Sequence, residues 1–125
     1  LLLRVKRPKD AIAHFEAAVA AKPAEYKPRF YLGEALFEAG RGADSELPYR
    51  KALELNPKAA EAALGLGQSL LNQRRTADAA PFFEQAASLD AAYRPGLLQL
   101  AQVYEADKDF AKAIAIYQRF PEDPT

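Results

Sequence analysis

The chain has 125 residues, with 17 Lys and Arg against 17 Asp and Glu, one His and no Cys. The lack of Cys excludes disulfides, Cys-ligated metal sites and a thiol nucleophile, and a single His cannot form a multi-histidine metal site. A net charge of zero argues against a nucleic-acid binder, and no apolar run approaches the about 20 residues of a membrane span. We therefore expect one domain without a cofactor or metal. The compartment stays open, because a chain without Cys suits the cytoplasm and the periplasm alike.

A regular repeat of about 34 residues runs through the sequence without a gap. Its clearest column is aromatic and contains Phe15, Tyr49, Phe83 and Tyr117. A second column, each time followed by Gly or Ala, contains Leu32, Leu66 and Leu100. The spacings Leu–small–x–x–Leu and small–x3–aromatic–x2–small each place their residues on one face of a helix. Each unit is therefore predicted to be two antiparallel helices that bury their faces by stacking on the next pair, which gives an all-α fold.

The period divides the chain into four units. Residues 1–25 form a truncated unit, 26–59 and 60–93 are complete, and 94–125 is nearly complete. Short turns are expected at Gly40 and Gly42, at 73–75 and at 107–109. The truncated first unit and the absence of an initiator Met suggest a fragment of a longer protein. In the alternative interpretation, residues 1–3 end a signal peptide or membrane helix that the basic residues after them would flank.

Prolines and acidic residues predict where the second helices of the units begin and end. Pro48 and Pro81 fit a helix only in its first turn, so these helices should begin late or have distorted first turns. Three aspartates share a column and are candidate N-caps: Asp10, Asp44 and Asp78. Pro121 should end the last helix near Arg119 or Phe120 and leave 122–125 as a tail. The last helix face should then need cover from other residues or another chain.

Two segments carry a family resemblance. Residues 30–36 read FYLGEAL and residues 49–57 read YRKALELNP. This pattern resembles the tetratricopeptide repeat, whose unit has the same length, with Leu-Gly/Ala in helix A and Ala…Phe/Tyr…Ala…Pro in helix B. The resemblance implies a right-handed α-solenoid, a superhelix of helix-turn-helix units. The sequence departs from the family where a large aromatic is usual near the start of helix A, since Arg29, Ala63 and Leu97 occupy that column.

The resemblance also implies a concave groove lined by the A helices, in which the family holds peptides. The positions that match the family's groove are Lys27, Phe30, Glu34, Phe37, Glu38, Glu61, Leu64, Gln68, Leu71, Asn72, Pro95, Leu98, Gln102, Glu105 and Ala106. Helical geometry agrees independently, because Phe30 and Phe37 are two turns apart on one face, as are Leu64 and Leu71. Amides in this set could bond a peptide backbone while apolar residues take its side chains. The alternative is that the large apolar residues mainly support packing.

Few other residues suggest chemistry. His14 stands beside Phe15, and no Ser or Asp spacing around it indicates a triad. The Gly65-Leu66-Gly67 segment lies in a predicted helix with no strand before it, so it fails the dinucleotide context. The carboxylates lie at turn-like spacing, as in Glu34 and Glu38, and fit solvated helix faces. We expect no catalytic residue and no enzyme activity.

These observations favour a scaffold that binds a protein or peptide in the concave groove. A chaperone-tail binder is disfavoured, because the positions of that family's carboxylate clamp hold no basic residue: Phe30, Glu34, Gly65, Pro95 and Gln99. RNA is disfavoured because the groove is neutral to acidic. Two alternatives stay open: self-association through uncapped ends, and a regulatory arm of an enzyme whose catalytic domain lies outside the fragment.

Overall fold

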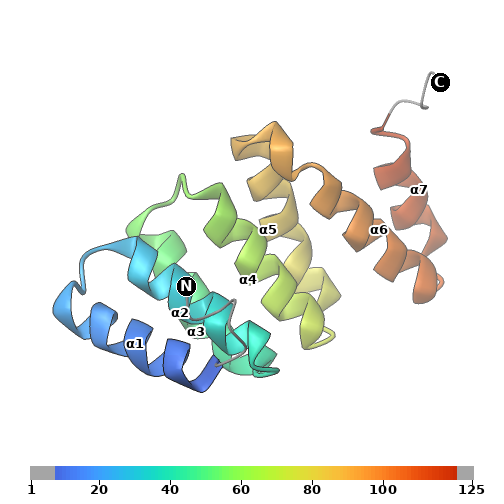
Figure 1. Cartoon of the computed structure of the whole chain (residues 1–125). Coiled ribbons are helices and arrows are strands. Elements are labelled where there is room, and N and C mark those ends of the chain that lie inside the picture. The colour runs from blue at the N-terminus through green and yellow to red at the C-terminus, as the bar shows by residue number, and fades with distance from the viewer. Residues whose placement is uncertain (1–7, 121–125) are drawn as a thin grey trace.

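The computed structural model describes residues 8–120, and in this range the chain forms seven α-helices, one short 3₁₀ helix and no strand (Figure 1). The helices are α1 (Pro8–Ala21), α2 (Tyr26–Glu38), α3 (Gly42–Leu55), α4 (Ala60–Asn72), α5 (Thr76–Leu89), η2 (Ala91–Tyr93), α6 (Pro95–Ala106) and α7 (Phe110–Tyr117). No described helix exceeds 14 residues, and none is long and apolar enough to cross a bilayer. The expectations for residues 1–3 and 122–125 lie outside the described residues.

Consecutive helices pack against one another along the whole described chain, and α2 also contacts α4 (Figure 1). The arrangement is a right-handed α-solenoid, which confirms the predicted fold class. Helices α2, α4 and α6 hold the A positions of the repeat, and α3, α5 and α7 hold the B positions. The pair α2–α3 lies within residues 26–59, α4–α5 within 60–93 and α6–α7 within 94–125.

The turns between A and B helices follow the same backbone course in each unit, at the positions that the sequence indicated. Gly40, Arg74 and Lys108 occupy the same column of the repeat, and their φ angles are 79°, 63° and 64°. The residue after each donates its N–H to a carbonyl near the end of the A helix, for example Arg41 to Leu36 at 2.8 Å and Asp109 to Tyr104 at 2.8 Å. This left-handed C-terminal cap is easy for glycine and strained for the other two.

The buried side chains form two clusters. The smaller joins α1 to α2 through Ala11, Ile12, Ala35 and Leu36. The larger runs from α3 to α7 and includes the fully buried side chains of Phe83, Leu66, Leu70, Leu97 and Leu100. The small residues of the repeat lie at close contacts in these clusters, because Ala11, Ala52, Ala79, Ala86 and Ala101 are completely buried. The interior is therefore a line of inter-helix contacts, as a stacked array requires.

The predicted N-caps are wrong. Helices α3 and α5 begin at Gly42 and Thr76, so Asp44 and Asp78 lie inside the first turn and the capping residues are Arg41 and Arg75. Each aspartate accepts a hydrogen bond from the preceding arginine instead, at 2.9 Å for Arg41 Nε–Asp44 Oδ2. Arg75 Nε lies 3.1 Å from Asp78 Oδ2. Asp10 likewise lies in the first turn of α1. A negative charge in the first turn still complements the helix dipole.

The two prolines lie inside their helices, so the expected late starts are also wrong. Pro48 follows the first residue of α3 by six positions, and Pro81 follows the first residue of α5 by five. A proline at position i leaves the carbonyl of residue i−4 without its helical donor. Asp44 and Ala77 carry those carbonyls, and both residues are exposed, so water can supply the missing hydrogen bond.

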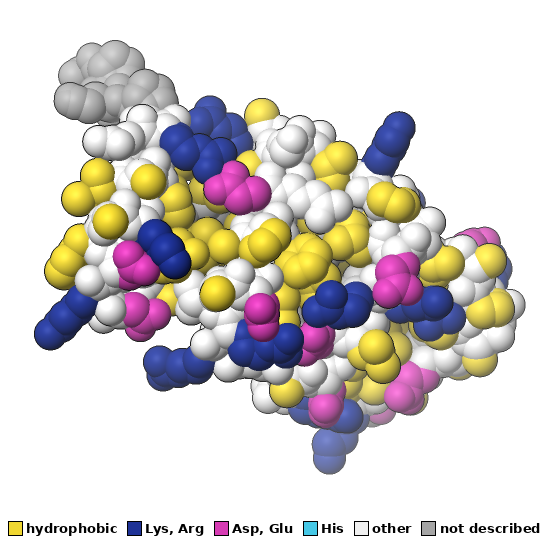
Figure 2. Space-filling model, turned by 180° about the vertical axis from the view of Figure 1, so that it is seen from behind, with side chains coloured by type: hydrophobic (Ala, Val, Ile, Leu, Met, Phe, Trp, Pro, Cys, Tyr) yellow, Lys and Arg dark blue, Asp and Glu magenta, His cyan; other side chains and the backbone are white. Residues whose placement is uncertain are grey.

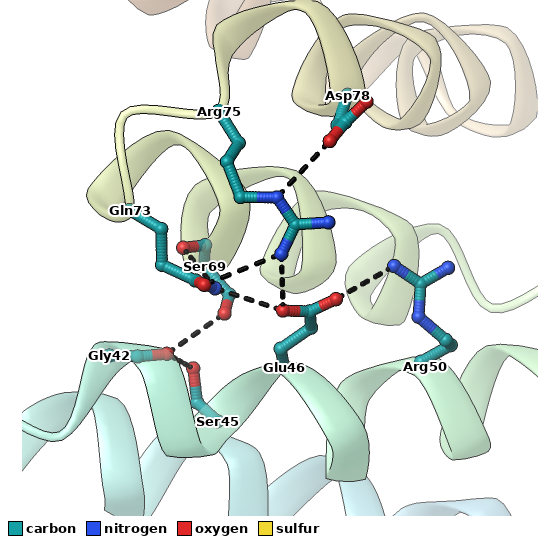
Figure 3. Close-up of polar contacts among 8 residues, drawn as sticks. All are labelled: Gly42, Ser45, Glu46, Arg50, Ser69, Gln73, Arg75 and Asp78. Carbon is teal, nitrogen blue, oxygen red and sulfur yellow. Dashed lines mark hydrogen bonds and ion pairs between the residues drawn. The ribbon is translucent and has the colours of Figure 1, made fainter.

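A polar network fastens α3 to α4 and to the turn before α5 (Figure 3). The Gly42 carbonyl accepts from two fully buried hydroxyls, Ser45 Oγ at 2.6 Å and Ser69 Oγ at 2.9 Å. The Glu46 carboxylate accepts from Arg50, Gln73 and Arg75 at 2.9, 3.1 and 2.8 Å. Burial alone would raise the pKa of Glu46, but these donors lower it below its ordinary value. The network therefore ties neighbouring units together through a charged carboxylate.

The last helix, α7, ends at Tyr117, two to three residues before the predicted end near Arg119 or Phe120. It exposes three large side chains on its surface, namely Phe110, Ile114 and Tyr117. After it, Arg94 donates to the Arg119 carbonyl at 2.9 Å and lies over the Phe120 ring at 4.9 Å. The exposed residues agree with the expectation of an uncovered last face. On the face seen from behind, basic and acidic side chains are interspersed (Figure 2).

Candidate functional site

The site is built around the ring of Tyr49, which comes from α3 and passes between two A helices. A Cβ placed on Gly33 of α2 would lie 2.9 Å from Tyr49 Cδ1, and a Cβ on Gly65 of α4 would overlap the same ring more deeply. The absence of a Cβ at both glycines therefore lets a large side chain from a B helix lie between α2 and α4. Tyr49 also contacts Phe30, with ring centroids 5.9 Å apart. Its side chain is 4% exposed.

A cavity of about 160 Å³ opens at this point, on the side of the A helices. Two rings in its lining come from α2 and α3, and a third, Tyr93, comes from η2. Its polar lining includes two carboxylates and one amide. The complete lining is Phe30, Glu34, Tyr49, Glu61, Leu64, Gly65, Gln68 and Tyr93, with no Lys or Arg among these residues.

The two carboxylates of the cavity come from facing helices, Glu34 from α2 and Glu61 from α4. Glu61 Oε2 accepts a hydrogen bond from the Tyr26 hydroxyl at 2.9 Å. For Glu34, no hydrogen bond or ion pair is found among residues 8–120. Burial, then the nearby charges of Glu38 and Glu61, raise the pKa of Glu34 above its ordinary value. Two carboxylates thus lie close together in a partly desolvated position, and no Lys or Arg within residues 8–120 pairs with either of them.

Three tyrosine hydroxyls share this electrostatic environment. Burial and the Glu61 hydrogen bond raise the pKa of Tyr26. Burial, followed by the charges of Glu61, Asp90 and Glu34, raises the pKa of Tyr93. Burial, followed by Glu34 and Glu38, raises the pKa of Tyr49. The Tyr49 hydroxyl has no hydrogen-bond partner in the described part of the chain. All three groups are therefore neutral at pH 7 and can donate or accept hydrogen bonds.

Five of the residues predicted from the sequence meet in this cavity: Phe30, Glu34, Glu61, Leu64 and Gln68. Leu71 and Asn72 line a second cavity of about 440 Å³ with Arg74, Thr76, Val103 and Asp107. Lys27 lines a third, of about 400 Å³, between α1 and α2. Glu105 accepts from the Tyr117 hydroxyl at 3.0 Å. None of these three cavities is lined by Phe37, Leu98 or Gln102.

Three residues of the cavity were not predicted as groove residues from the sequence: Tyr49, Gly65 and Tyr93. Tyr49 was expected only as a member of the buried aromatic column. The signal was the difference between Tyr49 and its equivalent Phe83, because the hydroxyl on a mostly buried ring must reach a polar partner or water, which a phenyl ring need not do. For Tyr93 the signal was Ala91, which stands where unit two has Pro57. There the chain makes the turn η2, in which the Asp90 side chain accepts from the Ala92 N–H at 2.9 Å.

The remaining candidates have structural surroundings. His14 is exposed and packs edge to face against Phe15, with centroids 5.2 Å apart. Gly65 and Gly67 lie inside α4, against the rings of Tyr49 and Phe83. Arg74 is the strained turn residue, and Arg75 pairs with Glu46. Among residues 8–120, no three His or acidic side chains come together as metal ligands.

A series of stacked antiparallel helix pairs, repeating at a constant interval along the chain, defines a helical-repeat solenoid whose A helices form one face. The chain belongs to the tetratricopeptide repeat family: models of this repeat match residues 1–59, 45–96 and 96–124. The family and the fold support a protein–protein interaction scaffold.

Solved structures agree on the fold. The crystal structure of MamA protein matches with a TM-score of 0.85 and 19% identity, over 94% of this chain and 64% of the MamA chain. YrrB, described as a TPR protein with an unusual peptide-binding site, matches with a TM-score of 0.81 and 21% identity, over 92% and 59%. The chain thus spans less than two thirds of either protein. No curated protein matches the chain in sequence.

Proposed function

We propose that the chain is a non-catalytic scaffold that binds a peptide segment of a partner protein on the face formed by α2, α4 and α6. The observation that carries the proposal is the cavity between α2 and α4, whose carboxylates are not paired with any Lys or Arg within residues 8–120. A half-buried carboxylate without a partner destabilises the fold, as expected for a group kept for binding. YrrB, with its peptide-binding site, is a precedent for such a site on this fold.

A peptide library tests this function. Random peptides displayed on phage are selected for binding to the chain and are then tested on Leu64→Lys, which places a cation in the cavity. The matched control is Leu47→Lys on α3, because Leu47 is 73% exposed and lines a different groove, with Arg29 and Leu32. Circular dichroism checks that both variants fold, and Gln68→Arg provides a second variant at a partly exposed position.

We expect selected peptides to bind the chain and Leu47→Lys equally, and to bind Leu64→Lys and Gln68→Arg at least tenfold more weakly. Peptides that bind all four proteins alike would contradict the proposed function. So would a library that yields no peptide.

A second candidate function is self-association, which the exposed apolar residues of α7 favour. Burying Phe110 and Ile114 against another copy would remove apolar surface from water. Sedimentation equilibrium of the chain and of Ile114→Glu tests it. A concentration-dependent dimer that Ile114→Glu dissociates supports this candidate, and a monomer at high concentration refutes it.

A further inference from the structure

The cavity between α2 and α4 combines aromatic walls with carboxylates. Phe30, Tyr49 and Tyr93 provide ring surfaces from three different elements, and Glu34 and Glu61 provide charge from two facing helices. Its volume of about 160 Å³ corresponds to about five water molecules. A space of this size can hold the head group of one long side chain, and it is too small for a whole peptide segment.

The chemistry of the lining selects a cation. An anionic group would face two carboxylates, and an apolar side chain would desolvate them further without a compensating partner. Aromatic rings attract a cation over their faces, and a planar guanidinium can stack on a ring while its N–H groups donate to carboxylates. The lining supplies no cation of its own.

The Tyr49 hydroxyl adds a second, independent indication of a missing ligand. Only 4% of this residue is exposed, and it lines the cavity. No hydrogen bond to the hydroxyl is found within residues 8–120, and its oxygen is not shielded from solvent, so it is open to a ligand in the cavity. The rigid position between Gly33 and Gly65 prevents the ring from turning away to find a partner. A ligand N–H entering the cavity could donate to this oxygen.

We propose that the cavity receives the guanidinium of an arginine side chain in the bound peptide, held between Glu34 and Glu61 and against the rings of Phe30 and Tyr93. This inference rests on the function proposed above and names the chemistry of its ligand. It also predicts that basic rather than acidic segments are preferred.

The test uses four short peptides of sequence acetyl-GSAAXAASG-amide, in which X is arginine, lysine, citrulline or glutamate. Citrulline has the shape of arginine without its charge. Dissociation constants come from chemical-shift titrations of the ¹⁵N-labelled chain. The arginine peptide is expected to bind about tenfold more tightly than the citrulline peptide, because charge-assisted hydrogen bonds exceed neutral ones by this order. The lysine peptide should bind several-fold more weakly than arginine, and the glutamate peptide more weakly than citrulline.

Variants of the chain locate the binding. The double variant Glu34→Gln/Glu61→Gln should bind the arginine peptide only as tightly as the wild-type chain binds the citrulline peptide. The matched control, Glu16→Gln/Glu54→Gln, changes net charge equally at exposed positions on α1 and α3 and should leave the affinity unchanged. Tyr49→Phe keeps the ring and removes only the unpartnered hydroxyl, so it should fold normally and bind arginine about threefold more weakly.

Equal affinities for the arginine and citrulline peptides would overturn the inference, and so would equal effects of the two double variants. Equal affinities for arginine and lysine would overturn the assignment of a guanidinium. If peptides from the library bind wild type but not Leu64→Lys, the proposed function survives the failure of the arginine inference. If no library peptide depends on Leu64, the proposed function fails as well.

Discussion

Gly65→Ala is the substitution for which the structure most clearly predicts whether the free energy of unfolding rises or falls. In the middle of a helix, Ala is normally more stable than Gly by about 1 kcal/mol. Here the new methyl would overlap the ring of Tyr49, and the ring cannot retreat because it already packs against Gly33 on α2, where even an added Cβ would lie 2.9 Å from it. Overpacking of this kind costs about 1–3 kcal/mol and outweighs the gain in propensity. We therefore expect Gly65→Ala to lower the free energy of unfolding by about 1 kcal/mol, which is the overpacking cost less the gain in helix propensity.

Urea unfolding followed by far-UV circular dichroism measures this change, and the m-value checks that the same structure unfolds. The control is the double-mutant cycle with Tyr49→Leu, which removes the ring. In that background, Gly65→Ala should be neutral or stabilising, so the coupling free energy should reach about 2 kcal/mol. A gain in stability from Gly65→Ala in the wild-type background would refute the packing described between α2 and α4.

Three further predictions concern stability. Glu46→Gln should lower the free energy of unfolding by about 1 kcal/mol at pH 7. Because the folded pKa of Glu46 is lowered, this loss should disappear as the pH falls below 4.5, whereas Glu54→Gln should show little effect at either pH. Glu34→Gln should have the opposite effect, because burial and then the charges of Glu38 and Glu61 raise the pKa of Glu34. The variant should raise the free energy of unfolding by less than about 1 kcal/mol at pH 7, and it should have no effect below pH 4.5. Urea titrations at pH 7 and at acidic pH check both signs, and equal shifts at the two pH values would contradict them. Ser69→Ala removes the hydrogen bond to the Gly42 carbonyl and should lower the free energy of unfolding by about 1 kcal/mol. An unchanged urea midpoint would refute that hydrogen bond.

The sequence was sufficient to predict the fold because the same pattern of residues recurs in each unit, so each unit supports the helix assignment of the others. The column of Phe15, Tyr49, Phe83 and Tyr117 and the Leu columns fix the phase of both helices in each unit. The turns were also predictable, and their left-handed residues keep the spacing of the repeat even where glycine is absent, as at Arg74 and Lys108. Stacking then follows from the need to bury apolar faces.

The helix starts were less predictable because local rules compete. Asp44 could cap a helix, but the turn carries Arg41, whose guanidinium pairs with that carboxylate when the helix begins two residues earlier. Pro48 is tolerated in the second turn because Asp44, whose carbonyl it leaves unpaired, is exposed. Such choices depend on side chains beyond the local segment.

The cavity was predictable only in part. Phe30, Glu34, Leu64 and Gln68 follow from the face of each A helix, and they do meet in space. The contribution of Tyr49 depends on two glycines from different helices, and that of Tyr93 depends on a turn that replaces the proline of the preceding unit. Neither contribution is visible from helical periodicity, because each is set by packing between units.

The most direct test of the central claim is to observe where an arginine side chain lies. Intermolecular NOEs between the labelled chain and the arginine peptide report which rings the side chain contacts. We expect NOEs from the arginine Hδ protons to the ring protons of Phe30 and Tyr93, and none to Phe82 of α5 or Tyr117 of α7. NOEs to those distant rings instead, or the same pattern from the citrulline peptide with equal affinity, would contradict the proposed arginine site.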